Sequence, residues 1–109
     1  MAEVPYCPME VANRVFGGKW KPGILFRLVE RSYRFGELKR DMPWISERVL
    51  IRQLKELVED GIVHREDHRQ VPPRVVYSIT EHGRTLAPLL KSMADWGDLH
   101  FEATTRCTS

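Results

Sequence analysis

The chain has 109 residues, of which 42% are apolar and 29% are charged, and its formal net charge is +2 at pH 7. This length and balance predict a single globular domain over residues 1–109 with one modest core. No apolar run approaches the length of a membrane span, and the N-terminal segment lacks the basic and apolar regions of a signal peptide. We therefore expect a cytoplasmic protein with no membrane partner. Because the net charge is small, only a local concentration of charge can indicate a nucleic-acid partner.

Two helices are expected before residue 31. Pro8 suits the first position of a helix over residues 8–16, and Gly17-Gly18 ends that helix. Apolar residues at helical spacing then predict a second helix over residues 20–30. The early proline of this second helix is tolerated because it falls in the first turn.

A pair of helices with a tight turn between them follows. Residues 32–34 predict a brief extended link to a short third helix over residues 35–41. Ser46 is a suitable N-cap for a fourth helix, which runs to about residue 60, and Gly61 takes the position after its end. The third and fourth helices together predict a helix-turn-helix.

The apolar period then changes from helical to two. Residues 62–66 and 74–79 predict two strands, and the polar segment 67–73, which contains two prolines, predicts a long hairpin tip. A hairpin directly after the second helix of a helix-turn-helix makes a winged helix-turn-helix. The predicted fold class is therefore α+β, mostly α, with the β-hairpin as the wing and helices at both ends.

The terminal helices are expected to form a dimer. Thr80 can cap a final helix over residues 81–103, in which Pro88 predicts either a kink or a true start closer to that proline. This helix has more apolar face than one small domain needs, and the first helix adds further apolar residues. We expect both to bury against the same surfaces of a second copy, related by two-fold symmetry. The predicted interface residues are Val11, Val15, Phe16, Leu89, Leu90, Met93, Trp96 and Phe101.

The fourth helix carries Arg48, Arg52 and Lys55 on the side opposite its apolar stripe. In a winged helix-turn-helix, this helix enters the major groove of double-stranded DNA, and its outer face contacts bases and phosphates. Residues 31–55 hold seven basic and three acidic residues, whereas the rest of the chain is net negative. The basic residues are therefore concentrated where the fold would meet phosphates.

The same face has a simpler alternative explanation. Arg52 and Glu56, and likewise Lys55 and Glu59, have the spacing of ion pairs on a solvated helix. An alternative function is a winged helix used only for protein–protein contact, which should show acidic or apolar residues on that face. Binding to random duplex DNA across salt concentration distinguishes these functions.

Four further residues are predicted to contact DNA, and three of them have a structural alternative. Ser46 is first a helix cap and second a phosphate or base contact. Arg34, at the start of a helix that faces the duplex, is a phosphate contact or a lone surface charge. Arg69 at the wing tip is a backbone or minor-groove contact, and Arg74 at the wing base is a contact or a guard of the strand edge.

Motifs along nearly the whole chain, about residues 7–97, resemble those of one family. In order they are CPME at 7–10, GGKW at 17–20, RFGEL at 34–38, IS at 45–46, VL at 49–50, LKELVEDGIV at 54–63, VPPRVVYSIT at 71–80 and EHGR at 81–84. Together, at this spacing, they resemble the HxlR-type transcriptional regulators, a branch of the winged-helix regulators related to MarR. The resemblance implies a sequence-specific homodimer on a DNA operator with two-fold symmetry. Position 51, often a small hydroxyl residue in the family, is Ile51 here, which either contacts a thymine methyl or widens the edge of the core.

Cys7 is a predicted redox-sensing residue. It precedes Pro8 and so lies at or next to an N-cap, where the helix dipole favours a thiolate. A small apolar plug between the terminal helices is the alternative role. Because some members of the family use the cysteine before the first helix to sense oxidants or electrophiles, the resemblance implies a small electrophile or oxidant as a partner. Cys107 is the predicted disulfide partner, from the second subunit.

No cofactor, metal or enzymatic site is predicted. His64 and His68 have the spacing of helical metal ligands but lie in a strand and a loop. The sequence has no evident Ser-His-Asp or Cys-His arrangement and no glycine-rich phosphate loop. A thiol-dependent enzyme built around Cys7 would need a general base and a pocket, and neither is visible in the sequence.

Overall fold

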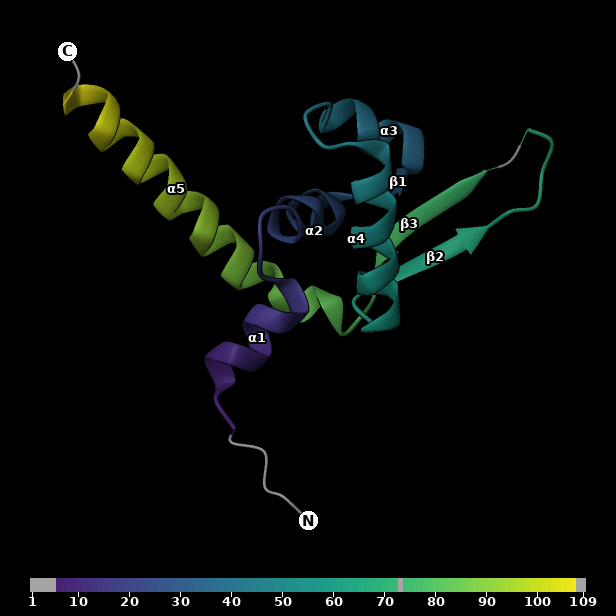
Figure 1. The fold of residues 1–109 in the computed structure, drawn as a ribbon, viewed down its shortest axis with the longest axis horizontal. Coiled ribbons are helices and arrows are strands. Elements are labelled where there is room, and N and C mark those ends of the chain that lie inside the picture. Colours follow the sequence, from purple (N-terminus) through teal and green to yellow (C-terminus); the bar gives the residue numbers. More distant parts are fainter. Residues whose placement is uncertain (1–5, 73, 108–109) are drawn as a thin grey trace.

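The computed structural model describes residues 6–72 and 74–107, with side chains as far as residue 105. Figure 1 shows α1 and α5 on one side of the molecule, whereas the hairpin of β2 and β3 projects from the other. The elements confirm the predicted winged helix-turn-helix, with α3 and α4 as the helix-turn-helix and the hairpin as the wing. In chain order they are α1 (Pro8–Phe16), α2 (Lys21–Glu30), β1 (Tyr33–Arg34), α3 (Phe35–Asp41), α4 (Glu47–Glu59), β2 (Val63–Asp67), β3 (Val75–Ile79), the 3-10 helix η1 (Gly83–Leu86) and α5 (Ala87–Cys107).

The ends of α4 are fixed by local chemistry, as predicted. Ser46 is the N-cap, and its Oγ accepts a hydrogen bond of 3.2 Å from the backbone N–H of Val49. At the other end, Gly61 has a φ of 75°, a left-handed conformation that favours glycine. These signals set where the helix begins and ends relative to the wing that follows.

The final helix confirms the predicted alternative of a true start closer to Pro88. Residues 83–86 form η1, and α5 starts at Ala87, so Pro88 lies in the first turn, where no backbone donor is needed. Thr80 precedes η1 instead of an α-helix, and its Oγ1 accepts a 2.9 Å hydrogen bond from the N–H of Gly83, the first residue of η1. No helix of the described ranges, α5 included, is long and apolar enough to cross a membrane.

The wing belongs to a three-stranded antiparallel sheet in the order β1-β3-β2. Residues 32–34 were expected only as a link, but Tyr33 pairs with Tyr77 and Arg34 pairs with Val76. A strand of two residues is too short to show an alternation of apolar and polar residues, and its partner strand lies far along the chain. β1 joins the start of α3 to the wing, which fixes the helix-turn-helix and the hairpin relative to each other.

The core lies between α4, α2 and the sheet. Leu50, Leu54 and Leu57 on the inner face of α4 are fully buried. They share one cluster with Ile24 and Leu25 of α2, which are also fully buried. Each such side chain contributes roughly 1.5–3 kcal/mol relative to an exposed one. The inner face of α4 is therefore committed to the core, and its other face is left for solvent or a partner.

Candidate nucleic-acid interface

The outer face of α4 is basic and open to solvent. Arg48, Arg52 and Lys55 are all exposed, and 49% of Ile51 beside them is exposed. Within residues 6–72 and 74–105, none of the three basic side chains takes part in an ion pair. Their guanidinium and ammonium groups are thus available to a ligand that approaches this face.

The acidic residue expected to neutralise Arg52 is engaged elsewhere. Glu56 Oε1 lies 3.5 Å from the Nζ of Lys21, in the first turn of α2. Lys21 is only 8% exposed, and Glu56 Oε2 is buried without a hydrogen-bond partner in the protein. The ion pairs of a solvated helix face are therefore not formed at Arg52 or Lys55 in the described structure.

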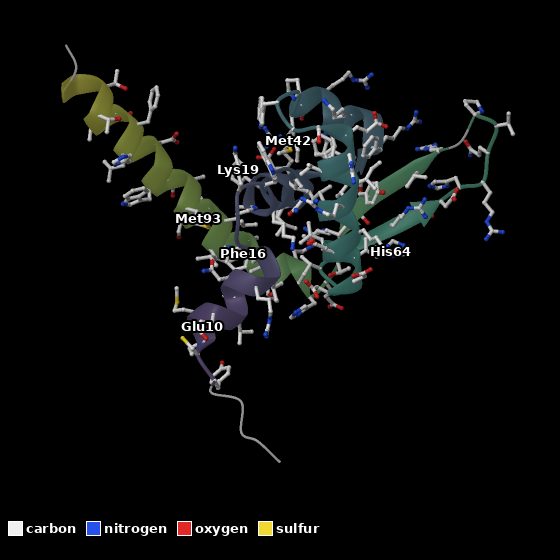
Figure 2. The ribbon with its side chains drawn as sticks, in the orientation of Figure 1. Glu10, Phe16, Lys19, Met42, His64 and Met93 are labelled. Carbon is white, nitrogen blue, oxygen red and sulfur yellow. The ribbon has the colours of Figure 1, made fainter. Side chains whose placement is uncertain are left out.

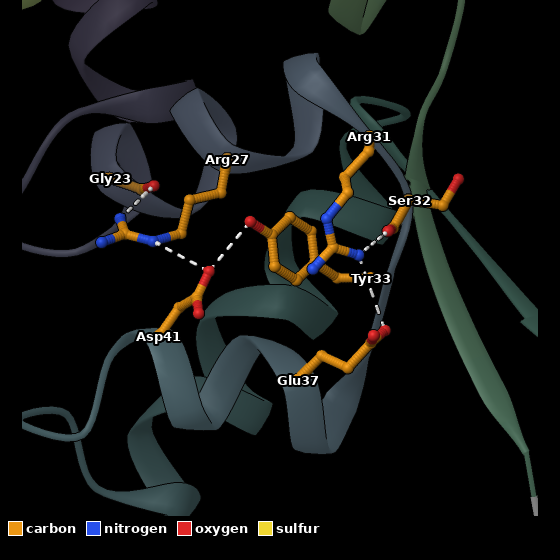
Figure 3. A network of polar contacts seen from close by, with 7 residues as sticks. All are labelled: Gly23, Arg27, Arg31, Ser32, Tyr33, Glu37 and Asp41. Carbon is orange, nitrogen blue, oxygen red and sulfur yellow. Dashed lines mark hydrogen bonds and ion pairs between the residues drawn. The ribbon is translucent and has the colours of Figure 1, made fainter.

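A polar network joins α2 to α3 (Figure 3). The Tyr33 hydroxyl donates a 2.9 Å hydrogen bond to Asp41 Oδ2, and the same oxygen lies 4.0 Å from Arg27 Nε. Arg27 also donates to the carbonyl of Gly23 at 3.0 Å. Burial, together with the hydrogen bond to Asp41, raises the pKa of Tyr33 above its usual value. The network holds the last turn of α3, and so the turn before α4, against α2.

The start of α3 places Arg34 on the surface. Its backbone N–H donates a 2.8 Å hydrogen bond to Glu37 Oε1, and the Arg31 guanidinium lies 3.7 Å from the same oxygen. Arg31 also stacks over the Tyr33 ring at 3.7 Å. The hydrogen bond from the Arg34 N–H, with the nearby charge of Arg31, holds the pKa of Glu37 below its usual value. Glu37 is therefore an ionised cap for the start of α3.

The wing carries two of the predicted contacts in different settings. Arg69 is exposed at the tip with a φ of 49°, and its N–H donates a 2.9 Å hydrogen bond to Asp67 Oδ1. Arg74 is half-buried at the base of the wing, and its carbonyl accepts a 2.9 Å hydrogen bond from the N–H of His68. Arg69 is thus open to solvent, whereas Arg74 is partly covered by the protein.

A hollow of about 380 Å³ lies between α4 and the wing. Its lining includes Ile51 and Lys55 of α4 and Arg65 and Tyr77 of the sheet. It therefore brings two predicted contacts together with Arg65, which the sequence analysis did not single out. Strand period could have identified Arg65, because it lies directly across from Tyr77 and so on the same face of the sheet.

The terminal helices keep most of their predicted apolar surface. Phe16 at the end of α1 and Met93 along α5 are marked in Figure 2. Phe16 and Leu90 belong to the core of the protomer, with 9% and 3% exposure, so their place on the predicted dimer surface is corrected. A shared helix face does not distinguish a residue that packs inward from one that packs against a partner. Val15 is half-buried, and the exposed members are Val11, Leu89, Met93, Trp96 and Phe101.

The two cysteines lie at the outer ends of these helices. Cys7 is the N-cap of α1, half-buried, and its thiol makes no capping hydrogen bond. Cys107 is the last residue of α5, and its side chain lies outside the described residues. Among the described residues, no three His, Cys, Asp or Glu side chains gather into a group that could hold a metal ion.

Comparison with known proteins adds independent information. A family profile described as HxlR-like helix-turn-helix matches residues 15–105. The HTH-type transcriptional regulator YdeP of Bacillus subtilis strain 168 is 48% identical over 92 residues, which cover 84% of this chain and 72% of YdeP. The redox regulator HypR in its reduced form superposes with a TM-score of 0.85 at 44% identity, over 92% of this chain and 99% of HypR. The reduced form of the regulator YodB from B. subtilis superposes with a TM-score of 0.73 at 35% identity, over 86% of this chain and 93% of YodB.

The matched region runs from the end of α1 almost to the end of α5 and includes the helix-turn-helix and the wing. The family resemblance inferred from the sequence motifs is thereby confirmed. The identities are far above the level at which only the fold is shared, and the proteins matched are transcriptional regulators. The chain is a helix-turn-helix transcriptional regulator and belongs to the HxlR-like family.

Proposed function

We propose that the protein binds double-stranded DNA sequence-specifically, as a homodimer on a pseudo-palindromic operator, with α4 in the major groove. The observation that carries this proposal is the exposed face of α4, where Arg48, Arg52 and Lys55 form no ion pair with any side chain that the structure describes. Arginine can read a guanine edge through two hydrogen bonds, and lysine can bind a phosphate as a point charge. Ile51 on the same face offers an apolar contact to a thymine methyl.

Residues outside α4 position the duplex and do not determine the sequence preference. Arg34 at the start of α3, Arg74 at the base of the wing and Arg69 at its tip are the proposed phosphate or minor-groove contacts. Ser46 already accepts the hydrogen bond of Val49, so its first role is the cap and its contact with DNA is secondary. Phosphate contacts fix orientation, while α4 supplies sequence preference.

The homodimer rests on the apolar surface of α1 and α5. Val11, Leu89, Met93, Trp96 and Phe101 are exposed in the protomer. Several large apolar residues left exposed on the terminal helices are typical of a subunit interface. A light-scattering mass of two chains at micromolar concentration supports this assembly, and a mass of one chain contradicts it.

The direct test of DNA recognition is selection of bound duplexes from a random pool. The selected duplex should show two related half-sites about one duplex turn apart, or a multiple of it. Failure to enrich any sequence, with no salt-dependent binding of random duplex, favours the alternative of a winged helix used only for protein–protein contact.

A redox response through Cys7 is a second proposal, supported by the relative HypR, which is named a redox regulator. Cys7 lies at the N-cap of α1, where the helix dipole favours an anion. With an oxidant such as diamide, Cys7 and Cys107 of the partner subunit would form a disulfide, as two thiols lose two protons and two electrons to the oxidant. Unchanged operator affinity after treatment with diamide, peroxide and a quinone would remove Cys7 as a switch. A covalent dimer that still forms in Cys107→Ser would exclude only the disulfide between Cys7 and Cys107.

A further inference from the structure

A hollow of about 350 Å³ lies between the start of α3 and the base of the wing. Arg34 and Arg40 line it from the α3 side, and Arg74 lines it from the start of β3. Arg74 is 34 positions after Arg40 and 40 positions after Arg34 in the sequence. The fold therefore assembles a cationic hollow that neither segment would make alone.

The charge of this hollow is not compensated inside the protein. Within residues 6–72 and 74–105, none of its three guanidinium groups takes part in an ion pair. Its one carboxylate, Glu37, already accepts the Arg34 backbone N–H at 2.8 Å and lies 3.7 Å from Arg31. The hollow has three positive charges against one committed negative charge, which suits an anion with several acceptor oxygens.

Arg74 combines a place in the lining of the hollow with one buried donor. Its Nε is buried from solvent and has no hydrogen-bond partner in the protein. Leaving a buried donor of a charged group without an acceptor is costly, and such donors are rare in native structures. Because this Nε is closed to solvent, a bound anion would contact the other nitrogens of the same guanidinium group, and an arginine binds a phosphate with a planar pair of donors.

The hollow lies on the face of the wing that α4 also flanks. Val75 lines it, whereas Tyr77, two residues further along β3, lines the other hollow beside Ile51 and Lys55 of α4. Residues two apart on a strand point to the same face. The arginine hollow and the hollow beside α4 therefore lie on the same face of the sheet.

We propose that this hollow binds one phosphate group of the DNA backbone in each half-site, through Arg34, Arg40 and Arg74. The inference rests on the proposed function and adds Arg40 and a defined phosphate to it. A phosphate held between α3 and the wing fixes how deeply α4 sits in the major groove, because α3 and β1 are continuous and β1 pairs with β3.

The first test measures binding of Arg40→Ala to the selected duplex and to a random duplex, across salt concentration. Both affinities should fall by a similar factor of about ten, and the slope of log affinity against log salt should become shallower by about one. Arg40→Lys keeps the charge but loses the paired donors, so its affinities should lie between those of Arg40→Ala and wild type. Arg84→Ala, an exposed arginine in η1, is the matched control and should bind as wild type.

The second test locates the phosphate. Methylphosphonate groups, which are neutral, replace single phosphates along the selected duplex. One position in each half-site should weaken the wild type about ten-fold and leave Arg40→Ala unchanged. An Arg40→Ala variant that binds as wild type, or that loses affinity equally at every methylphosphonate position, overturns the proposal. If inorganic phosphate alone raises the melting temperature of wild type but not of Arg40→Ala, while the methylphosphonate scan shows no such position, the hollow binds a free anion and the DNA assignment is wrong.

Failure of the proposed function is distinguishable from failure of this inference. If wild type binds no duplex in a salt-dependent way, the proposed function fails and the inference fails with it. If wild type binds the selected duplex and loses affinity on Arg48→Ala but not on Arg40→Ala, only the phosphate hollow is wrong.

Discussion

The ammonium group of Lys21 lies 3.5 Å from a carboxylate oxygen of Glu56, so α2 engages the acidic residue of α4 that would otherwise neutralise Arg52. Lys21 is buried, while the side chain of Glu56 is 40% exposed. In its degree of burial, this ion pair is therefore intermediate between an exposed ion pair and a fully buried one. It links the stability of the α2–α4 contact to the charge of the surface that is proposed to meet DNA.

Lys21→Met should destabilise the protein by about 1–2 kcal/mol, because it leaves Glu56 partly buried without its cation. It should also weaken DNA binding, since the released carboxylate of Glu56 is one helical turn from Arg52. Urea midpoints and affinity for the selected duplex measure the two effects. The double variant Lys21→Met/Glu56→Gln is the control and should recover most of the affinity. A double variant that binds as poorly as Lys21→Met contradicts the role of Glu56.

Tyr33→Phe should cost about 1 kcal/mol, because Asp41 loses a hydrogen-bond donor. The raised pKa of Tyr33 also gives a pH dependence. The hydroxyl is protonated in the folded protein at pH values where it ionises in the unfolded chain. Its stabilising contribution is therefore complete below the unfolded pKa of about 10 and is lost as the pH rises through the folded pKa. Urea midpoints between pH 8 and pH 11 should fall more steeply for wild type than for Tyr33→Phe, and parallel curves would exclude this linkage.

Leu89 and Leu90 are adjacent in α5, but Leu90 should stabilise the protomer and Leu89 the dimer. Leu90 is 3% exposed and belongs to the core, so Leu90→Ala should cost about 2–5 kcal/mol. Leu89 is 44% exposed, so Leu89→Asp should shift the mass in light scattering from two chains towards one with little loss of helix content. The contrasting result, a dimeric Leu89→Asp with wild-type affinity between subunits, would remove this part of α5 from the interface.

Arg48→Ala or Arg52→Ala should cost about 1–3 kcal/mol on the selected duplex and relax the preference at one base pair. A loss of base preference distinguishes a base contact from a phosphate contact, because Arg69→Ala should weaken binding to all DNA sequences alike. Competition between the selected duplex and single-base variants measures the preference. If both substitutions leave the profile of preferred bases unchanged, α4 does not read the operator.

Local signals predicted most of the fold. The bounds of α1 and α3 agree with the sequence analysis. Pro8 and Gly17 mark the two ends of α1, and α3 lies between a short extended link and the tight turn before α4. The start of α5 was predicted only as two alternatives, because Thr80 is a good N-cap in sequence, whereas in the structure it accepts a hydrogen bond from the first residue of η1. The strand β1 was missed because its identity depends on pairing with a distant segment of the chain.

The candidate interface was predictable only in part. Helical period alone identified Arg48, Arg52 and Lys55, since their face is opposite the leucines of α4. The engagement of Glu56 by Lys21 was not predictable, because those residues are 35 positions apart and meet only through packing. Arg40 was counted as local charge, and its place beside Arg34 and Arg74 depends on how α3 docks against the wing.

The most direct measurement of the central claim is equilibrium binding of wild type to its selected duplex and to a random duplex, between about 50 and 200 mM salt. Recognition by α4 with phosphate contacts around it predicts a steep loss of affinity with salt on both duplexes. It also predicts a preference of 10³-fold or more for the selected duplex over the random one, within the range of specific DNA-binding proteins. Affinity that is independent of salt, or equal on the two duplexes, would contradict sequence-specific DNA binding by this protein.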